Sequence, residues 1–170
     1  IDLYLADAQT GKIIRKLTSR ANNSHIDEFS FIESAGAWSP DSKRFAFSAF
    51  SAGRNKLFVI DVKTGKTLSE AAMGEVGEFS NLSWSPNGED IAFTGLKNGF
   101  SDIYIFNTKT KKLTQLTNDR YSDYQPSFSP DGRSLVFTTD RTTLVGGSMG
   151  AEITYNLAIM DLATRAVKDI

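Results

Sequence analysis

One short phrase occurs three times in this chain and constrains its fold more than any other feature. The copies are Trp38-Ser39-Pro40-Asp41-Ser42, Trp84-Ser85-Pro86-Asn87-Gly88 and Phe128-Ser129-Pro130-Asp131-Gly132, and an apolar segment follows each. Their aromatic residues are 46 and 44 residues apart. A period of this length is typical of stacked repeats, because one unit cannot bury its apolar faces without its neighbours. We therefore expect an array of similar units.

Each copy of the phrase has the composition of a tight turn that leads into a strand. Pro favours the first turn position, Asp or Asn hydrogen-bonds nearby backbone, and Gly accepts a positive φ. Ser42 departs from the pattern by replacing glycine. The segments after the turns are Phe45-Ala46-Phe47-Ser48, Ile91-Ala92-Phe93-Thr94 and Leu135-Val136-Phe137-Thr138. Their alternation of large and small residues is typical of sheets packed face to face, with both faces covered.

The aromatic residues of these segments are expected in the core. Phe47 and Phe93 occupy matching places in their strands, and an aromatic ring buries a large area between sheets. The same argument favours core packing for the aromatic residue that begins each phrase, over a platform that stacks sugars or bases. Those residues are Trp38, Trp84 and Phe128.

A second phrase describes a buried strand that runs into a hairpin. It reads Asp2-Leu3-Tyr4-Leu5-Ala6-Asp7, Leu57-Phe58-Val59-Ile60-Asp61, Asp102-Ile103-Tyr104-Ile105-Phe106-Asn107 and Leu157-Ala158-Ile159-Met160-Asp161. A Thr follows three residues after each final Asp or Asn, as expected of a turn. The next strand is more mixed, as in 12–17 and 112–117, which suits a sheet edge shielded by charge. The repeat unit is therefore predicted to have four strands.

These residues carry a family resemblance. The segment from Leu116-Thr117-Asn118-Asp119 through 126–137 to Asp140-Arg141 resembles the repeat of the TolB-like β-propellers, a branch of the WD-type propeller class. The resemblance extends over nearly the whole chain and implies an all-β fold. It implies less about function, because propellers of this kind serve as binding scaffolds, as appendages of peptidases and as parts of envelope proteins.

The repeats divide the chain into about three and a half four-stranded blades. We expect the two outer strands of a blade at 1–18, an inserted loop at 19–34, and full blades at 35–71, 81–117 and 125–170, the last with an inserted loop at 139–153. Propellers close with four to eight blades, so this number is expected to represent a partial array. The remaining blades of a larger protein are then the first expected partners.

Composition excludes several classes of function. The 19 basic and 20 acidic residues give a net charge of −1, which argues against a nucleic-acid surface. No apolar run is long enough to cross a bilayer as a helix. There is no Cys, and the turn residues Asp41, Asn87 and Asp131 do not resemble a calcium loop, so we expect neither a metal nor a cofactor.

Two connections are longer than their counterparts, and they suggest a binding face. From the third strand of one unit to the first strand of the next, the spans are 34, 26 and 24 residues, so the first carries an insertion around 19–34. From the second strand to the third they are 11, 11 and 21 residues, so the last blade carries an insertion around 139–153. Both kinds of connection emerge on one face of a propeller, and insertions on one face often mark a binding surface.

The candidate binding residues lie in these insertions and in the equivalent connections of the other blades. Tyr and Arg are the side chains expected to anchor a protein or peptide partner. The alternative is that all of them are ordinary solvated loop residues. The candidates are His25, Asp27, Glu28, Arg54, Asn55, Asn98, Arg120, Tyr121, Asp123, Asp140 and Arg141.

One motif invites a catalytic interpretation and lacks the context for it. Gly146-Gly147-Ser148-Met149-Gly150 fits the G-x-S-x-G pattern of serine hydrolases, but the only His, His25, lies upstream. We therefore predict a non-catalytic binding module. The alternative is an accessory propeller of a larger peptidase or hydrolase whose catalytic domain lies outside this chain. The family resemblance implies a periplasmic or extracellular location.

Overall fold

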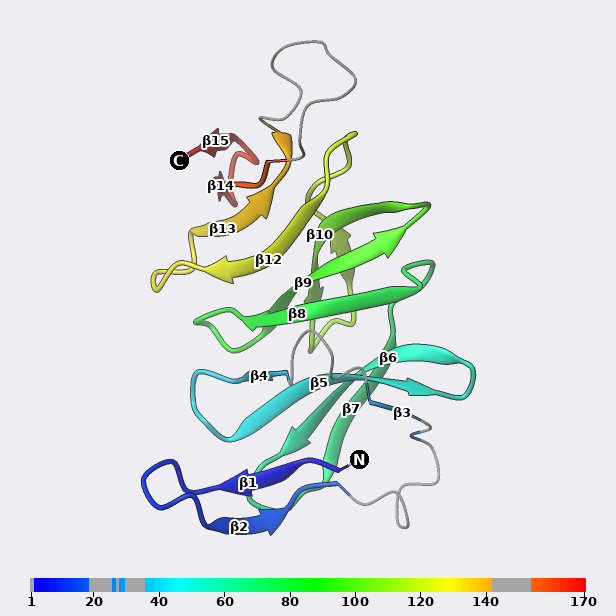
Figure 1. The fold of residues 1–170 in the computed structure, drawn as a ribbon, viewed down its shortest axis with the longest axis vertical. Helices are drawn as coiled ribbons and strands as arrows, with labels where there is room; N and C mark the ends of the chain where they lie inside the picture. The colour runs from blue at the N-terminus through cyan, green and yellow to red at the C-terminus, as the bar shows by residue number, and fades with distance from the viewer. Residues whose placement is uncertain (1, 19–25, 27, 30–35, 142–153) are drawn as a thin grey trace.

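The chain folds as a row of stacked antiparallel β-sheets (Figure 1). The computed structural model describes residues 2–18, 26, 28–29, 36–141 and 154–170. No α-helix occurs among these residues, which confirms the all-β class predicted from the sequence. The described part of the chain also has no helix long and apolar enough to cross a membrane.

Within these described ranges, fifteen strands form four sheets. The first sheet contains β1 (Tyr4–Ala6) and β2 (Ile13–Lys16). The second contains β3 (Glu28–Phe29), β4 (Ala37–Trp38), β5 (Arg44–Ser51), β6 (Arg54–Asp61) and β7 (Thr67–Ala72). The third contains β8 (Glu78–Trp84), β9 (Asp90–Lys97), β10 (Phe100–Asn107) and β11 (Leu113–Gln115). The fourth contains β12 (Asp123–Phe128), β13 (Ser134–Thr139), β14 (Asn156–Asp161) and β15 (Val167–Asp169).

The strand order within each sheet follows the chain, as expected for propeller blades. In the third and fourth sheets four strands pair in sequence, and in the second sheet both β3 and β4 pair with β5 ahead of β6 and β7. The first sheet has only two strands among the described residues. The architecture is a β-propeller fragment of about three and a half blades.

The apolar core of the described chain lies between the sheets in three layers. Phe47 and Phe58 of the second sheet face the first, with ring centroids 5.4 Å apart. Phe93 lies in the layer between the second and third sheets, and Phe137 in the layer between the third and fourth. Phe47 is 2% exposed and Phe93 is fully buried, which confirms the core positions predicted from the alternating pattern.

The prediction that Trp38 is a core residue is wrong. Trp38 is 47% exposed, whereas Trp84 at the equivalent position is 8% exposed and its Nε1 donates a hydrogen bond to Ala37 O at 3.1 Å. Trp84 is buried because the inner strands β4 and β5 of the preceding sheet lie against it. The first sheet has no equivalent strands in the described chain to cover Trp38. Phe128 is half-buried and packs against the third core layer.

The repeated turns contain the side-chain hydrogen bonds and the positive φ that their residues predict. Ser39 Oγ donates to Asp41 Oδ1 at 2.6 Å, and Ser129 Oγ makes the same bond to Asp131 Oδ1. These bonds hold the pKa of both carboxyl groups below its usual value. Ser42, which replaces the turn glycine, has a φ of 57°. The backbone therefore keeps the left-handed conformation that glycine adopts without strain in the other two copies.

The connections gather at two opposite ends of the sheets. The β5–β6 and β9–β10 turns lie at one end with the links 73–77 and 116–122, on the right in Figure 1. We call this the loop end. The turns that contain Pro40, Pro86 and Pro130 lie at the other end, on the left in Figure 1, which we call the turn end.

Candidate functional site

The described candidate residues lie at the loop end. Arg54 and Asn55 begin β6, Asn98 lies in the β9–β10 turn, and Arg120 and Tyr121 lie between β11 and β12. Asp123 begins β12, and Asp140 and Arg141 follow β13. Glu28 belongs to β3. His25, Asp27 and the Gly146–Gly150 motif lie outside the described residues.

Arg141 organises the fourth sheet at this end. Its guanidinium pairs with both carboxylate oxygens of Asp123, one of them at 3.0 Å, and Asp123 is fully buried. Nη2 also contacts Asp119 Oδ2 at 2.6 Å, and Nη1 donates to Thr139 Oγ1 at 2.7 Å. A fork of this kind fixes the guanidinium plane, because each donor has a defined acceptor. We call Asp119, Asp123, Thr139 and Arg141 the arginine cluster.

Tyr121 lies beside two guanidinium groups at the surface of this cluster. The Cζ atoms of Arg120 and Arg141 are each 5.3 Å from its ring centroid. Arg120 Nη2 also donates to Tyr121 Oη at 3.3 Å. Cation–π contacts at this distance favour one ring orientation. An amphipathic side chain with a preset orientation is a good anchor for a partner, since less entropy is lost on binding.

Asp140 ties the two loops of this end together. Its carboxylate accepts a hydrogen bond from Ser122 N at 2.9 Å, and its own N–H donates to Ser122 O at 3.3 Å. The link 116–122 is therefore held against the end of β13. The result is a rim in which Arg120, Tyr121 and Asp119 project from a fixed backbone.

The candidates of the second and third sheets do not join this cluster. Asn55 Nδ2 donates to Gly77 O at 2.9 Å and so fastens the β7–β8 link. Asn98 has a φ of 53° in the β9–β10 turn, and Arg54 is exposed at the start of β6. They lie at the same end of the molecule, on other sheets.

Two acidic residues near this end, Asp119 and Asp102, were not among the candidates predicted from the sequence. Asp102 is 3% exposed, and it accepts hydrogen bonds from Gln115 Nε2 at 3.0 Å and Thr117 Oγ1 at 3.2 Å. Burial raises the pKa of the Asp102 carboxyl, and the charges of Asp123 and Asp119 add to that effect. Asp2 and Thr18 occupy the equivalent places in the first repeat. This recurrence of an Asp and a Thr could have identified Asp102 from the sequence.

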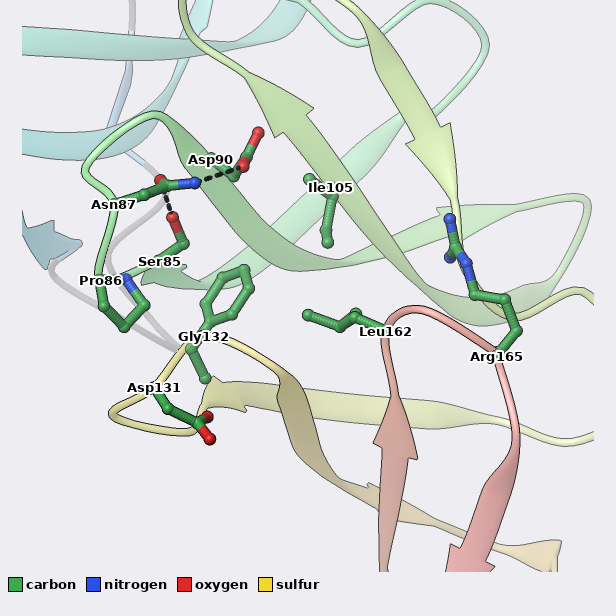
Figure 2. Close-up of a pocket in the computed structure, with 10 residues that line it drawn as sticks. Ser85, Pro86, Asn87, Asp90, Ile105, Asp131, Gly132, Leu162 and Arg165 are labelled. Atoms are coloured by element: carbon green, nitrogen blue, oxygen red, sulfur yellow. Dashed lines mark hydrogen bonds between the residues drawn. The ribbon is translucent and has the colours of Figure 1, made fainter.

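A cavity of about 310 Å³ lies at the opposite, turn end, between the third and fourth sheets (Figure 2). Ile105, Leu162 and Phe128 supply its apolar walls. Asp90 accepts hydrogen bonds from Asn87 Nδ2 at 3.1 Å and Asn107 Nδ2 at 2.7 Å. The other lining residues are Ser85, Pro86, Asn87, Asp131, Gly132 and Arg165. None of the candidate binding residues whose side chains the structure describes lines it.

Metal-binding chemistry finds no support in the described part of the chain. No group of three or more His, Cys, Asp or Glu residues there has the arrangement of a metal site. Four acidic residues near the loop end have partners within the protein. Asp119 and Asp123 pair with Arg141, Asp102 accepts hydrogen bonds from Thr117 and Gln115, and Asp140 accepts one from a backbone N–H.

Comparison with known families decides the relationship suggested by the repeats and the stacked sheets. A model of the TolB beta propeller domain matches residues 20–148. The chain belongs to this TolB β-propeller family. No curated protein sequence matches it.

Solved structures share the fold of this TolB-type propeller. TolB from Acinetobacter baumannii superposes with a TM-score of 0.66 at 24% identity, over 99% of this chain and 37% of that protein. A putative TolB from Agrobacterium tumefaciens gives 0.65 at 19% identity, over 95% of this chain and 57% of that one. A prolyl endopeptidase gives 0.63 at 18% identity, over 99% of this chain and 25% of its own. The chain thus spans less than two thirds of each of these proteins.

Proposed function

We propose that this TolB-type propeller segment is a non-catalytic binding module that recognises a protein or peptide partner through its loop end. One observation supports this most: Arg120 and Tyr121 stand at the surface in orientations set by the arginine cluster beneath them. Side chains of these two types carry much of the binding free energy in protein interfaces.

The buried part of the cluster supports recognition by holding the surface part still. Asp123 neutralises Arg141 inside the sheet, and Asp140 fixes the link 116–122. A partner then meets a rim that is already ordered, and the free energy lost to immobilising side chains is smaller. His25, Asp27, Glu28, Arg54, Asn55 and Asn98 are proposed to extend this surface toward the first three sheets.

The experiment compares the two ends of the protein. An array of random synthetic peptides is screened with the wild-type protein, and the affinities of the selected peptides are measured for Tyr121→Ala and Arg120→Ala. Arg133→Ala, an exposed arginine at the turn end that does not line the cavity there, is the matched control. We expect a loss of about tenfold or more for Tyr121→Ala, as for an interface anchor, and no loss for the control. Equal binding by all variants would contradict the proposal.

A second candidate function is supported by the likeness to the prolyl endopeptidase fold. The chain would then be the accessory propeller of a larger peptidase or hydrolase, with the catalytic domain outside these residues. The test is the flanking reading frame: a nucleophile-elbow or HExxH segment there favours this function. Peptidase activity of this chain itself that Ser148→Ala abolishes would contradict both candidates.

The family also supports a location and a set of partners. We propose a periplasmic or extracellular protein whose first partners are further propeller blades, with no nucleic acid and no cofactor. Export of an epitope-tagged protein, followed by fractionation of periplasm and cytoplasm, tests the location.

A further inference from the structure

The second and third sheets meet at the turn end through an arginine. Arg44, the first residue of β5, places its guanidinium over the ring of Trp84, with Cζ 4.8 Å from the ring centroid. Its Nη2 donates to Gly88 O at 3.0 Å. Pro40 stands against Gly88, such that a Cβ built there would lie 3.5 Å from Pro40 Cγ. One cation thus joins an aromatic face and a turn carbonyl across the two sheets.

The same backbone arrangement recurs one repeat later, without the arginine. Ser39 N bonds Arg44 O at 2.9 Å, and Ser85 N bonds Asp90 O at 2.9 Å, so Asp90 occupies the place of Arg44. Pro86 stands against Gly132 in the same way, at 3.5 Å from a Cβ built there. Phe128 takes the place of Trp84. The third sheet therefore presents a short carboxylate where the second presents a long cation.

The cavity between the third and fourth sheets lies at this substituted position. It is lined by Asp90, Phe128 and Gly132, the counterparts of Arg44, Trp84 and Gly88. Among the described residues none donates a hydrogen bond to Gly132 O, whereas Gly88 O accepts one from Arg44. An aromatic ring, a carbonyl oxygen and a carboxylate together form the environment that a guanidinium group prefers.

We propose that this cavity binds the guanidinium group of an arginine-containing ligand, in the place that the Arg44 side chain fills one repeat earlier. Phe128 offers the ring face, Gly132 O the acceptor and Asp90 the opposing charge. The volume of about 310 Å³ is at the lower end of small-ligand pockets, which run from roughly 300 to 1,000 Å³. The site is separate from the loop end and does not depend on the function proposed there.

The acidic side chains and the arginine of the cavity lie at different ends of it. Asn87 and Asp131 lie at one end of the cavity and Arg165 at the other, beyond Ile105 and Leu162 (Figure 2). The cation is therefore expected on the side of the cavity nearest Asp90, away from Arg165. Ile105 and Leu162 would contact the aliphatic stem of the arginine, as apolar surface commonly does.

Calorimetric titration with matched ligands tests the site. The probes are the capped peptides Ac-Ala-Arg-Ala-NH2, its lysine and its citrulline versions, and free arginine. We expect one bound arginine peptide per chain, and affinity about tenfold or more weaker for citrulline, which keeps the shape and loses the charge. Whether free arginine binds as well as the peptide separates a small metabolite from a peptide segment, and either result supports the shared chemistry. Equal binding of the three peptides, or no binding of any, overturns the proposal.

Three variants locate the binding. Asp90→Asn removes the opposing charge and is expected to weaken binding by about tenfold. Asp131→Asn removes a charge farther from the guanidinium and is expected to weaken binding less; it keeps the turn, since Asn87 already makes the same backbone bond in the preceding copy. Asp90→Arg supplies the group in cis and is expected to abolish binding of the peptide. Unchanged affinity in Asp90→Asn and Asp90→Arg, with both folded by circular dichroism, overturns the assignment.

The preceding repeat offers a gain-of-site control. Arg44→Ala removes the guanidinium from between the second and third sheets but leaves Trp84 and Gly88. The variant is expected to bind a second arginine peptide about tenfold more weakly than the first, because residue 44 is then an alanine and supplies no counterpart of the Asp90 carboxylate. A single site of unchanged affinity in Arg44→Ala would contradict the equivalence of the two places.

Discussion

The third and fourth sheets carry different chemistry at the same backbone positions of the loop end. In the third sheet Phe79 pairs with Gly95, and in the fourth Asp123 pairs with Thr139. Phe79 packs on Phe93 with centroids 5.2 Å apart, whereas Asp123 binds Arg141. The repeat therefore specifies the sheet, while one buried position can hold either an apolar side chain or an ion pair. The ionic version is the one that supports an ordered polar rim.

The largest expected effect is a loss of stability when an aromatic ring is removed from the apolar core of the third sheet. Phe93→Ala removes a fully buried ring that contacts Phe79 and Tyr104. We expect the free energy of unfolding to fall by about 3–5 kcal/mol, because a cavity remains between the sheets. Urea denaturation measures the loss, and Phe50→Ala, which truncates an exposed ring, is the control. A loss below about 1 kcal/mol would show that the sheets do not pack there.

In the fourth sheet, removal of Asp123 should lower the stability by leaving a buried charge without its main partner, rather than by leaving a cavity. Asp123→Ala leaves Arg141 half-buried with Asp119 as its remaining carboxylate partner, and we expect a loss of about 3 kcal/mol. Replacing both members, by Asp123→Leu with Arg141→Met, should recover part of that stability, since no unpaired charge remains. A double variant less stable than Asp123→Ala in urea unfolding would mean that the pair contributes more than charge compensation. The double variant should also disturb the rim and weaken peptide binding.

Gly95 tests how closely the apolar version is packed. A Cβ at Gly95 would lie 2.7 Å from both Tyr104 Cδ2 and Val76 Cγ1, while Thr139 has a side chain at the equivalent position. Gly95→Ala is expected to destabilise the protein by about 1–3 kcal/mol through overpacking. Gly77→Ala, where a Cβ meets nothing within 4 Å, is the matched control. Equal thermal stability of the two variants would show that the third sheet adjusts freely.

The smallest effect concerns Asp102, which pairs with Gly95 where the fourth sheet pairs Asn156 with Thr139. Burial raises the pKa of Asp102, so the folded state binds its proton more tightly than the unfolded state does. Its contribution to stability is present below the ordinary carboxyl pKa and is lost as pH rises through the raised value. Relative to Asp102→Asn, the wild type should lose stability as the pH rises from about 4 toward neutrality. A constant difference measured by urea unfolding would contradict the shift.

Much of the fold could be predicted from local patterns. Alternating large and small residues in 45–48, 91–94 and 135–138 predicted sheets packed on both faces, and Phe47 and Phe93 confirm it. The failure at Trp38 has a physical reason. The Trp38 ring is buried only if the inner strands of a neighbouring sheet pack against it. The five residues of the repeated turn motif carry no information about those strands.

The site was harder to predict than the sheets. The equivalence of the connections between blades predicted that Arg120, Tyr121, Asp140 and Arg141 lie at one end. It did not predict the fork by which Arg141 contacts Asp123 and Asp119. That contact needs the register of β12 with β13, including the irregularity between Tyr124 and Ser127, where Gln125 has a φ of 55°. A count of residues along the two strands cannot reveal a bulge.

The sequence by itself determined the repeat, the strands and the turn residues, because each depends on neighbours within a few positions of the chain. Only the tertiary structure decided which charges meet and where space remains. Arg44 fills the junction of the second and third sheets, and Asp90 leaves a cavity at the next. Side-chain length matters there only because two sheets, formed by residues about 44 positions apart, are held at a set distance by the core between them.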